Sequence, residues 1–223
     1  MKLFFDLETI PTQNEILIAD ITKTVTHPKT IKKQETIDKW NAEQKPAAIE
    51  TAVEKTVFDG GAGEIITFGY QFEDEDPQAM QRNESMSEHD LLTQINNALK
   101  DLLSKNNVMN KPIWIGHNIA GFDLRYLWKR FIVNKIMPVT PIPYDVKAWD
   151  KSIYDTMFEW AGTSNDKKSM DFVCKALGIK GKGGFDGSMV YEAWKNKEFN
   201  KIKEYCIDDV MRTVEIYKRL NFQ

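Results

Sequence analysis

The sequence predicts an α/β fold, in which strands and helices alternate after a strand-rich start. Strand-favouring residues open the chain at 3–5, and a second such run, EIITFGYQF, occupies 64–72. Two long segments, at 87–105 and 199–219, carry apolar residues at helical spacing. Because both periodicities occur in one chain, neither an all-α nor an all-β fold fits the pattern.

The other elements follow from local signals. The first strand ends before Pro11, which interrupts regular structure, and a short apolar run after Pro112 predicts a buried strand. A helix is expected to open near Asn118. The expected strands are at 1–8, 64–72 and 112–115. The expected helices are at 87–105, 168–177, 188–197 and 199–219, with a further helix that begins near 118.

Residues 28–56 are expected to form a largely helical insertion in a single domain that spans 1–223. They hold the polar stretch KQETIDKWNAEQK, followed by AAIETAVEK. Ala47, Ile49 and Val53 give this second stretch a partial helical stripe. A glycine-rich run then breaks the chain before the strand at 64–72.

The composition predicts a soluble globular protein. A net charge of −3 and a pI near 5.7 leave nucleic acid open as a partner without indicating it. Cys174 and Cys206 are far apart and form no CxxC motif, which favours a reducing, cytoplasmic location. No apolar run is long enough to span a bilayer and no signal sequence is recognisable, so no membrane association is expected.

Asp6 and Glu8 are the first candidate metal ligands. They lie two residues apart in a predicted strand, so both carboxylates point to the same face, about 6.5–7 Å apart along the strand. Such a pair can hold a cation between its oxygens. The alternative is a solvated strand end, where an Asp-x-Glu sequence is common.

Asp123 is a third candidate, placed early in a helix that follows a central strand. Open α/β sheets bind ligands at the carboxyl ends of their strands. The alternative is an acid that only interacts favourably with the helix dipole.

Asp209 is a fourth candidate, in the last predicted helix. At about 100° per residue it falls within the apolar stripe, whereas Asp208 points toward the polar side. A carboxylate in a buried stripe is costly unless it is paired or bound to metal. Tyr205 lies one turn earlier on the same side. Pairing of Asp209 with a neighbouring Lys or Arg is the alternative.

Three segments resemble the three motifs of the DEDD exonucleases and occur in the same order. They are FDLETIP at 5–11, GHNIAGFDLRYL at 116–127 and YCIDDV at 205–210. Tyr205-x-x-x-Asp209 resembles the DEDDy subtype, in which a tyrosine replaces the histidine of DEDDh enzymes. With further similar segments at 46–70, 154–160 and 169–194, the chain resembles the predicted 3′→5′ exonucleases related to the proofreading domain of family B DNA polymerases over nearly its whole length.

This resemblance implies a ribonuclease H-like fold and hydrolysis of phosphodiester bonds from the 3′ end of single-stranded DNA. Two divalent cations, Mg²⁺ or Mn²⁺, would be held by four carboxylates. Asp6 would bridge both cations, Glu8 and Asp209 would hold the one that activates water, and Asp123 would contribute to the other. Tyr205 would orient the attacking water, because a free phenol is a poor base at neutral pH.

The same resemblance implies four substrate contacts. Asn118 and Phe122 would touch the terminal nucleotides, Phe122 by stacking, and Leu7 and Thr9 would line the site of the 3′ end. Core packing is the alternative for Phe122, and a structural role is the expectation for the neighbouring His117. Asp155 is expected to make a structural hydrogen bond.

Three other functions remain open at this point. A ribonuclease D-like RNA-trimming enzyme would use the same four carboxylates, so RNA stays a possible substrate. A catalytically silent nucleic-acid-binding module is a second alternative, although it leaves the carboxylates without a purpose. A two-carboxylate glycosidase would use Asp6 and Glu8 but leaves Asp209 and Tyr205 unexplained. Partner proteins in replication or repair cannot be named from the sequence.

Overall fold

The computed structural model describes residues 1–105, 111–147, 150–164, 166–181 and 183–223. Its centre is a mixed five-stranded sheet in the order β3-β2-β1-β4-β5. β2 is antiparallel to both β1 and β3, whereas β4 runs parallel to β1 and to β5. The strands are β1 (Lys2–Ile10), β2 (Glu64–Phe72), β3 (Gln78–Gln81), β4 (Ile113–Gly116) and β5 (Ile153–Asp155).

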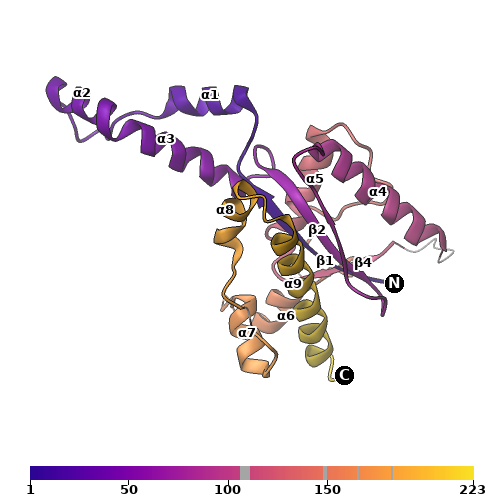
Figure 1. Ribbon diagram of the computed structural model, residues 1–223. Helices are drawn as coiled ribbons and strands as arrows, with labels where there is room; N and C mark the ends of the chain where they lie inside the picture. The colour runs from indigo at the N-terminus through magenta and orange to yellow at the C-terminus, as the bar shows by residue number, and fades with distance from the viewer. Residues whose placement is uncertain (106–110, 148–149, 165, 182) are drawn as a thin grey trace.

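Helices cover both faces of this sheet (Figure 1). On one face lie α4 (Glu88–Lys105) and α5 (Asp123–Val133), and across the other runs α9 (Phe199–Leu220). Three shorter helices, α6 (Thr156–Ala161), α7 (Met170–Leu177) and α8 (Val190–Lys195), lie on the α9 side, with the 3₁₀ turn η2 (Gly187–Met189) before α8. A mixed sheet flanked by helices confirms the expected α/β, ribonuclease H-like fold.

The alternation of side chains along β1 decides which residues meet which helices. Leu3, Phe5 and Leu7 belong to the large apolar core that also contains residues of α4 and α5. The intervening positions face α9, since Phe4 packs with Val210 and Ile10 packs beside Ile202. Asp6 and Glu8 lie between Phe4 and Ile10 in this second set. The fold therefore directs both carboxylates toward α9.

A helical arm projects from the end of β1, as Figure 1 shows. The arm (residues 15–58) holds α1 (Glu15–Thr24), α2 (Gln34–Glu43), α3 (Lys45–Glu54) and the 3₁₀ turn η1 (Lys55–Phe58). Neither α1 nor α3 has a buried residue, and α2 buries only Trp40. Helices that bury so little against the sheet contribute little to the main core.

Several expected elements differ in detail. The helix expected near Asn118 begins at Asp123, because Asn118 has a φ of 66°, in the left-handed region that a right-handed helix does not use. The helix expected at 188–197 is shorter and is preceded by a separate 3₁₀ turn. The short strands β3 and β5 and the helix α1 were not predicted, because segments of this length give weak periodic signals.

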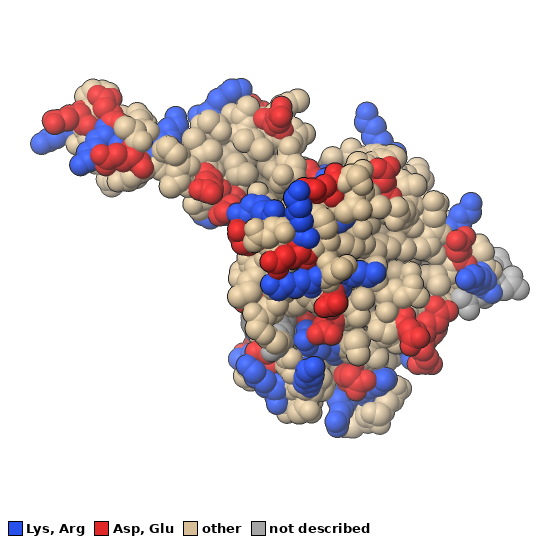
Figure 2. Space-filling view, in the orientation of Figure 1, with Lys and Arg blue, Asp and Glu red and all other residues tan. Residues whose placement is uncertain are grey.

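Charges of both signs are interspersed over the face shown in Figure 2. This agrees with the small net charge of −3. Within the described part of the chain, no helix combines the length and the apolar character needed to cross a bilayer.

Candidate active site

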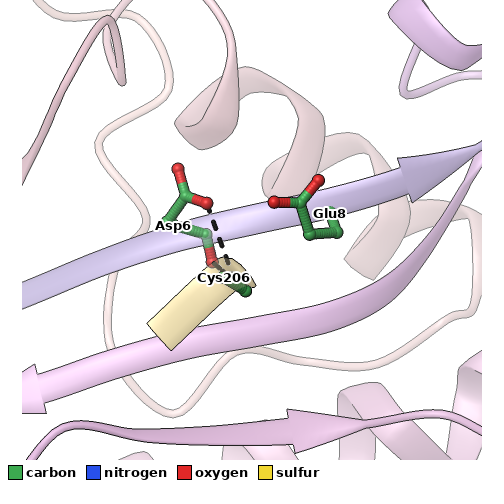
Figure 3. A group of neighbouring side chains, drawn as sticks. All are labelled: Asp6, Glu8 and Cys206. Atoms are coloured by element: carbon green, nitrogen blue, oxygen red, sulfur yellow. Dashed lines mark hydrogen bonds between the residues drawn. The ribbon is translucent and has the colours of Figure 1, made fainter. Parts of the chain in front are cut away.

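Asp6 and Glu8 project from the same side of β1, as the strand alternation predicts (Figure 3). Glu8 is buried and Asp6 is partly buried. Among the described residues, oxygens of these two carboxylates and the Cys206 sulfur all lie within 4.8 Å of one another. The two carboxylates are therefore close enough to share a cation.

Gly69 allows α9 to approach these carboxylates. It pairs with Asp6 across the β1–β2 ladder. A Cβ atom on Gly69 would lie 2.7 Å from the Cys206 sulfur, so a larger residue would push the helix away. The helix is close enough for the Cys206 thiol to contact the backbone carbonyl and the Oδ2 of Asp6, each at 3.6 Å.

Cys206 places a thiol beside the two carboxylates. Burial raises the pKa of its thiol well above the usual value, and the negative charges of Asp6, Glu8 and Asp209 raise it further. In the metal-free protein the protonated thiol therefore donates toward Asp6.

Tyr205 and Asp209 come from the buried side of α9. Asp209 is 4% exposed, whereas the side chain of its neighbour Asp208 is 55% exposed, so the predicted difference between these two acids is confirmed. Tyr205 is hydrogen-bonded to Asp209. Burial, followed by the charges of Asp209 and Glu8, raises the phenol pKa above its usual value. The hydroxyl therefore stays protonated and acts as a hydrogen-bond donor at neutral pH.

Arg212 also contacts Asp209, one turn further along α9. One guanidinium nitrogen donates to Asp209 Oδ1, and the other lies 3.2 Å from Asp208 Oδ2. The pairing of Asp209 with a neighbouring Arg, which the sequence left as an alternative, is thus present. It does not exclude a metal role, because a carboxylate has two oxygens and can accept from more than one partner.

Asp123 opens α5 and is 5% exposed. Burial raises the pKa of its carboxyl to about 7, and the nearby charges of Asp155 and Asp209 act in the same direction. The backbone N–H groups of Asp123 and Leu7 donate to it and partly oppose that rise. A carboxyl that is costly to ionise in the metal-free protein gains from a cation placed beside it.

Asp155 organises the loop that leads to Asp123. Its Oδ1 accepts from the backbone N–H of Asn118 at 2.8 Å, and its Oδ2 accepts from that of Ala120 at 3.0 Å. Oδ1 also accepts from the N–H of Met157, which caps α6. The expected structural hydrogen bond is confirmed, and it holds Asn118 in its left-handed conformation.

The remaining predicted residues fall into two groups. Leu7, Thr9 and Phe122 line one pocket beside Glu8, and Asn118 is not among the residues that line it. His117 has a structural setting, because its ring nitrogens lie 2.9 Å from Thr156 Oγ1 and 3.0 Å from the Lys168 carbonyl. His117 is therefore held by its neighbours, as expected.

Two residues of the site were missed from the sequence. Cys206 was not expected beside Asp6, and the neighbouring Lys or Arg that was weighed as a partner of Asp209 was not assigned to Arg212. The spacing of Arg212, three residues after Asp209 in a helix, is a signal that could have revealed that pair. Nothing in the sequence brings residue 206 next to residue 6.

The donor atoms fit hard divalent cations. The four candidate carboxylates offer only oxygens, which Mg²⁺ and Mn²⁺ prefer. Asp123 and Asp209 are not part of the 4.8 Å group of Asp6, Glu8 and Cys206 among the described residues. The charge of Asp209 nevertheless raises the pKa values of Asp123, Tyr205 and Cys206.

Comparison with solved structures supports the same class of fold. The family B DNA polymerase of the hyperthermophilic archaeon Pyrobaculum calidifontis matches 98% of this chain with a TM-score of 0.57 and 14% sequence identity. The match covers 24% of the polymerase chain, so this chain corresponds to a small part of that protein. At this identity the likeness concerns the fold alone.

The sequence family is more specific. Residues 78–223 match the family described as "Predicted 3'-5' exonuclease related to the exonuclease domain of PolB", and the chain belongs to that family. A search of curated proteins found no match. The expected membership is thus confirmed, and the matched region contains Asp123, Tyr205 and Asp209 but not the arm or β1.

Proposed function

We propose that this protein is a metal-dependent exonuclease that removes nucleotides from the 3′ end of single-stranded DNA. The observation that carries the proposal is the closeness of the Asp6 and Glu8 carboxylates on β1, with Asp209 acting electrostatically on both Tyr205 and Asp123. These groups come from three separate elements, β1, α5 and α9. A scatter of acids used only for solubility would remain exposed, whereas Glu8, Asp123 and Asp209 are buried.

The four carboxylates are the groups that would hold two divalent cations. When bound, two cations activate the attacking water and stabilise the leaving oxygen of the phosphodiester. Asp6 and Glu8 are fixed by the strand, and the backbone N–H groups that donate to Asp123 fix its carboxyl. This preorganisation lets the protein bind cations without first rearranging its backbone.

Tyr205 would position the attacking water. Its raised pKa means that the phenol keeps its proton, so it is unsuited to act as a general base. Part of the rise in this pKa comes from a hydrogen bond of the phenol with Asp209. A water held between the hydroxyl and a carboxylate would have a fixed orientation toward the phosphate.

Arg212 would stabilise the protein before cations bind. It compensates the negative charge of Asp209, which is buried and otherwise costly. It also keeps the Asp209 side chain in place through a second contact with Asp208. Arg212 would therefore have a stabilising role, whereas the four carboxylates and Tyr205 would take part in the reaction.

The test is the pattern of degradation of labelled strands. Matched single-stranded DNA and RNA oligonucleotides, each labelled at the 5′ end, would be incubated with Mg²⁺ or with excess EDTA. The proposal predicts a ladder of DNA products shortened one nucleotide at a time, formed only with metal. Faster degradation of RNA would shift the assignment to an RNA-trimming enzyme, and full hydrolysis in EDTA would contradict the proposed mechanism.

A further inference from the structure

A pocket of about 670 Å³ lies beside Glu8, at the end of β1. Its lining comes from four parts of the chain: the end of β1, the α3–η1 part of the arm, Phe122, and the η2–α8 segment. Its volume is within the range of about 300–1,000 Å³ that is usual for small-molecule sites. The pocket is therefore large enough for a nucleoside next to the candidate metal ligands.

The walls of this pocket carry three aromatic rings. Phe58 comes from η1, Phe122 precedes α5, and Tyr191 belongs to α8. Phe58 is 75% exposed, although a large apolar ring is costly to leave in water. Nucleobases stack on such rings with little dependence on sequence.

The charges around the pocket suit the neutral part of a nucleotide. Glu54 and Lys55 line the arm side with opposite signs, and Glu8 is the other charged residue that lines it. A phosphate would meet two carboxylates and one lysine here, which is unfavourable. An uncharged base and sugar would meet the rings and the apolar side chains, while the phosphate would stay with the candidate metal ligands.

The arm wall is fixed to the strand that carries Glu8. The Thr9 hydroxyl donates to the Val57 carbonyl at 3.2 Å, and the Thr12 N–H donates to the Thr56 hydroxyl at 2.8 Å. A Cβ atom on Gly63 would lie 2.6 Å from the Thr56 carbonyl oxygen, so this packing requires glycine. The position of Phe58 relative to Glu8 is thus set by the fold.

We infer that the α3–η1 part of the arm forms the wall of a pocket for the terminal nucleoside of the strand, with Phe58 stacking on its base. The inference rests on the proposed function and adds to it a role for the arm, which lies outside the region matched to the family, 78–223. The chemistry recognised is a nucleobase at a strand end. It is distinct from metal binding, because none of the arm residues is a candidate ligand.

The experiment measures binding of a strand end directly. Single-stranded DNA would carry the fluorescent base 2-aminopurine at its 3′ end and a phosphorothioate as its last linkage, which resists hydrolysis. A second strand would end in an abasic sugar. Fluorescence quenching and anisotropy would be recorded with Mg²⁺ for the wild type, Phe58→Ala, Phe58→Trp and Thr51→Trp, which fills the pocket from α3.

Phe222→Ala is the matched control, because Phe222 is 99% exposed and does not line the pocket. Loss of a stacking ring should weaken binding of the base-ended strand by about tenfold or more. Phe58→Ala and Thr51→Trp should both show this loss and reduced quenching, and Phe58→Trp should restore binding. The abasic strand should bind the wild type and Phe58→Ala equally.

The outcomes separate the inference from the function on which it rests. The wild type could degrade DNA with metal, bind base-ended and abasic strands equally, and bind no better than Phe58→Ala. In that case the inferred role of the arm is wrong and the proposed function stands. If the wild type neither degrades nor binds either strand, the proposed function fails and the inference fails with it.

Discussion

The two faces of β1 are built from alternating residues of one strand, yet they differ in chemistry. Toward α4 and α5 the strand presents Leu3, Phe5 and Leu7, which are buried in the largest apolar core. Toward α9 it presents Asp6 and Glu8, flanked by Phe4 and Ile10. Burial of apolar side chains on the first face stabilises the fold. On the second face carboxylates are buried, and burying a charge costs free energy.

This difference separates stability from activity. Substitutions on the α4–α5 face should lower the free energy of unfolding, and they should affect hydrolysis only as far as the protein unfolds. Substitutions of Asp6 and Glu8 on the α9 face should abolish hydrolysis and leave the metal-free protein as stable as before, or more so. Such a relation is expected where a functional site stores unfavourable interactions.

The largest effect is expected for Asp209→Asn, which keeps the side-chain volume and removes the charge. Hydrolysis of labelled single-stranded DNA should fall by orders of magnitude, because a neutral amide is a poor ligand for Mg²⁺. Asp208→Asn is the control: its side chain is exposed, and its activity should stay within a few-fold of wild type. An inactive Asp208→Asn protein with an active Asp209→Asn protein would show that the motif register is wrong.

A second experiment compares the two faces within β1. Phe5→Ala should lower the free energy of unfolding by about 3–5 kcal/mol, as expected for a buried phenylalanine. Glu8→Gln, measured by urea unfolding in EDTA, should leave stability unchanged or higher, because a buried charge is removed. A Glu8→Gln protein as destabilised as Phe5→Ala would mean that Glu8 is a structural residue.

Tyr205→Phe should have an intermediate effect. Removal of one preorganised hydrogen-bond donor from an active site costs about 10²–10³-fold in turnover. Binding of metal and DNA should change little, because the hydroxyl positions water and does not hold a cation. Steady-state kinetics would therefore show a lower kcat with a similar KM and a smaller loss than for Asp6→Ala. Wild-type turnover in Tyr205→Phe would show that the Tyr205 hydroxyl does not position the attacking water.

The last of these predictions concerns pH. The folded protein raises the pKa of Asp123 from 3.8 to about 7, so folding favours the protonated carboxyl. This group therefore stabilises the metal-free protein fully below about pH 4, and the stabilisation is lost as the pH rises through 7. Mn²⁺ binds the ionised form, so its stabilisation should increase over the same range. Melting temperatures of wild type and Asp123→Asn, with and without Mn²⁺, would isolate this contribution. Identical pH profiles for the two proteins would contradict it.

Much of this arrangement could be predicted from local sequence. The strand spacing placed Asp6 and Glu8 on one face, and the helical spacing separated Asp209 from Asp208, since both patterns depend only on neighbours along the chain. The start of α5 was predicted too early, because the left-handed Asn118 is held by Asp155, which is 37 residues away. Contacts between distant segments leave no periodic signal.

The same limit explains the missed features of the site. Cys206 meets Asp6 only because Gly69 lets α9 approach the sheet. The pocket beside Glu8 depends on the arm folding back so that Val57 meets Thr9. In both places the sequence predicted the element that carries the residue, and the tertiary packing decided what lies next to it.

The central claim is that the α9-facing carboxylates hold divalent cations, and counting bound Mn²⁺ by electron paramagnetic resonance tests it most directly. The measurement would use wild type, Asp208→Asn and an Asp6→Asn/Glu8→Gln double variant, each with a 3′-phosphorothioate strand. Wild type and Asp208→Asn should bind two Mn²⁺ ions per chain at about millimolar concentration, and the double variant should lose this binding. Equal binding by the double variant, or none by the wild type, would contradict the claim.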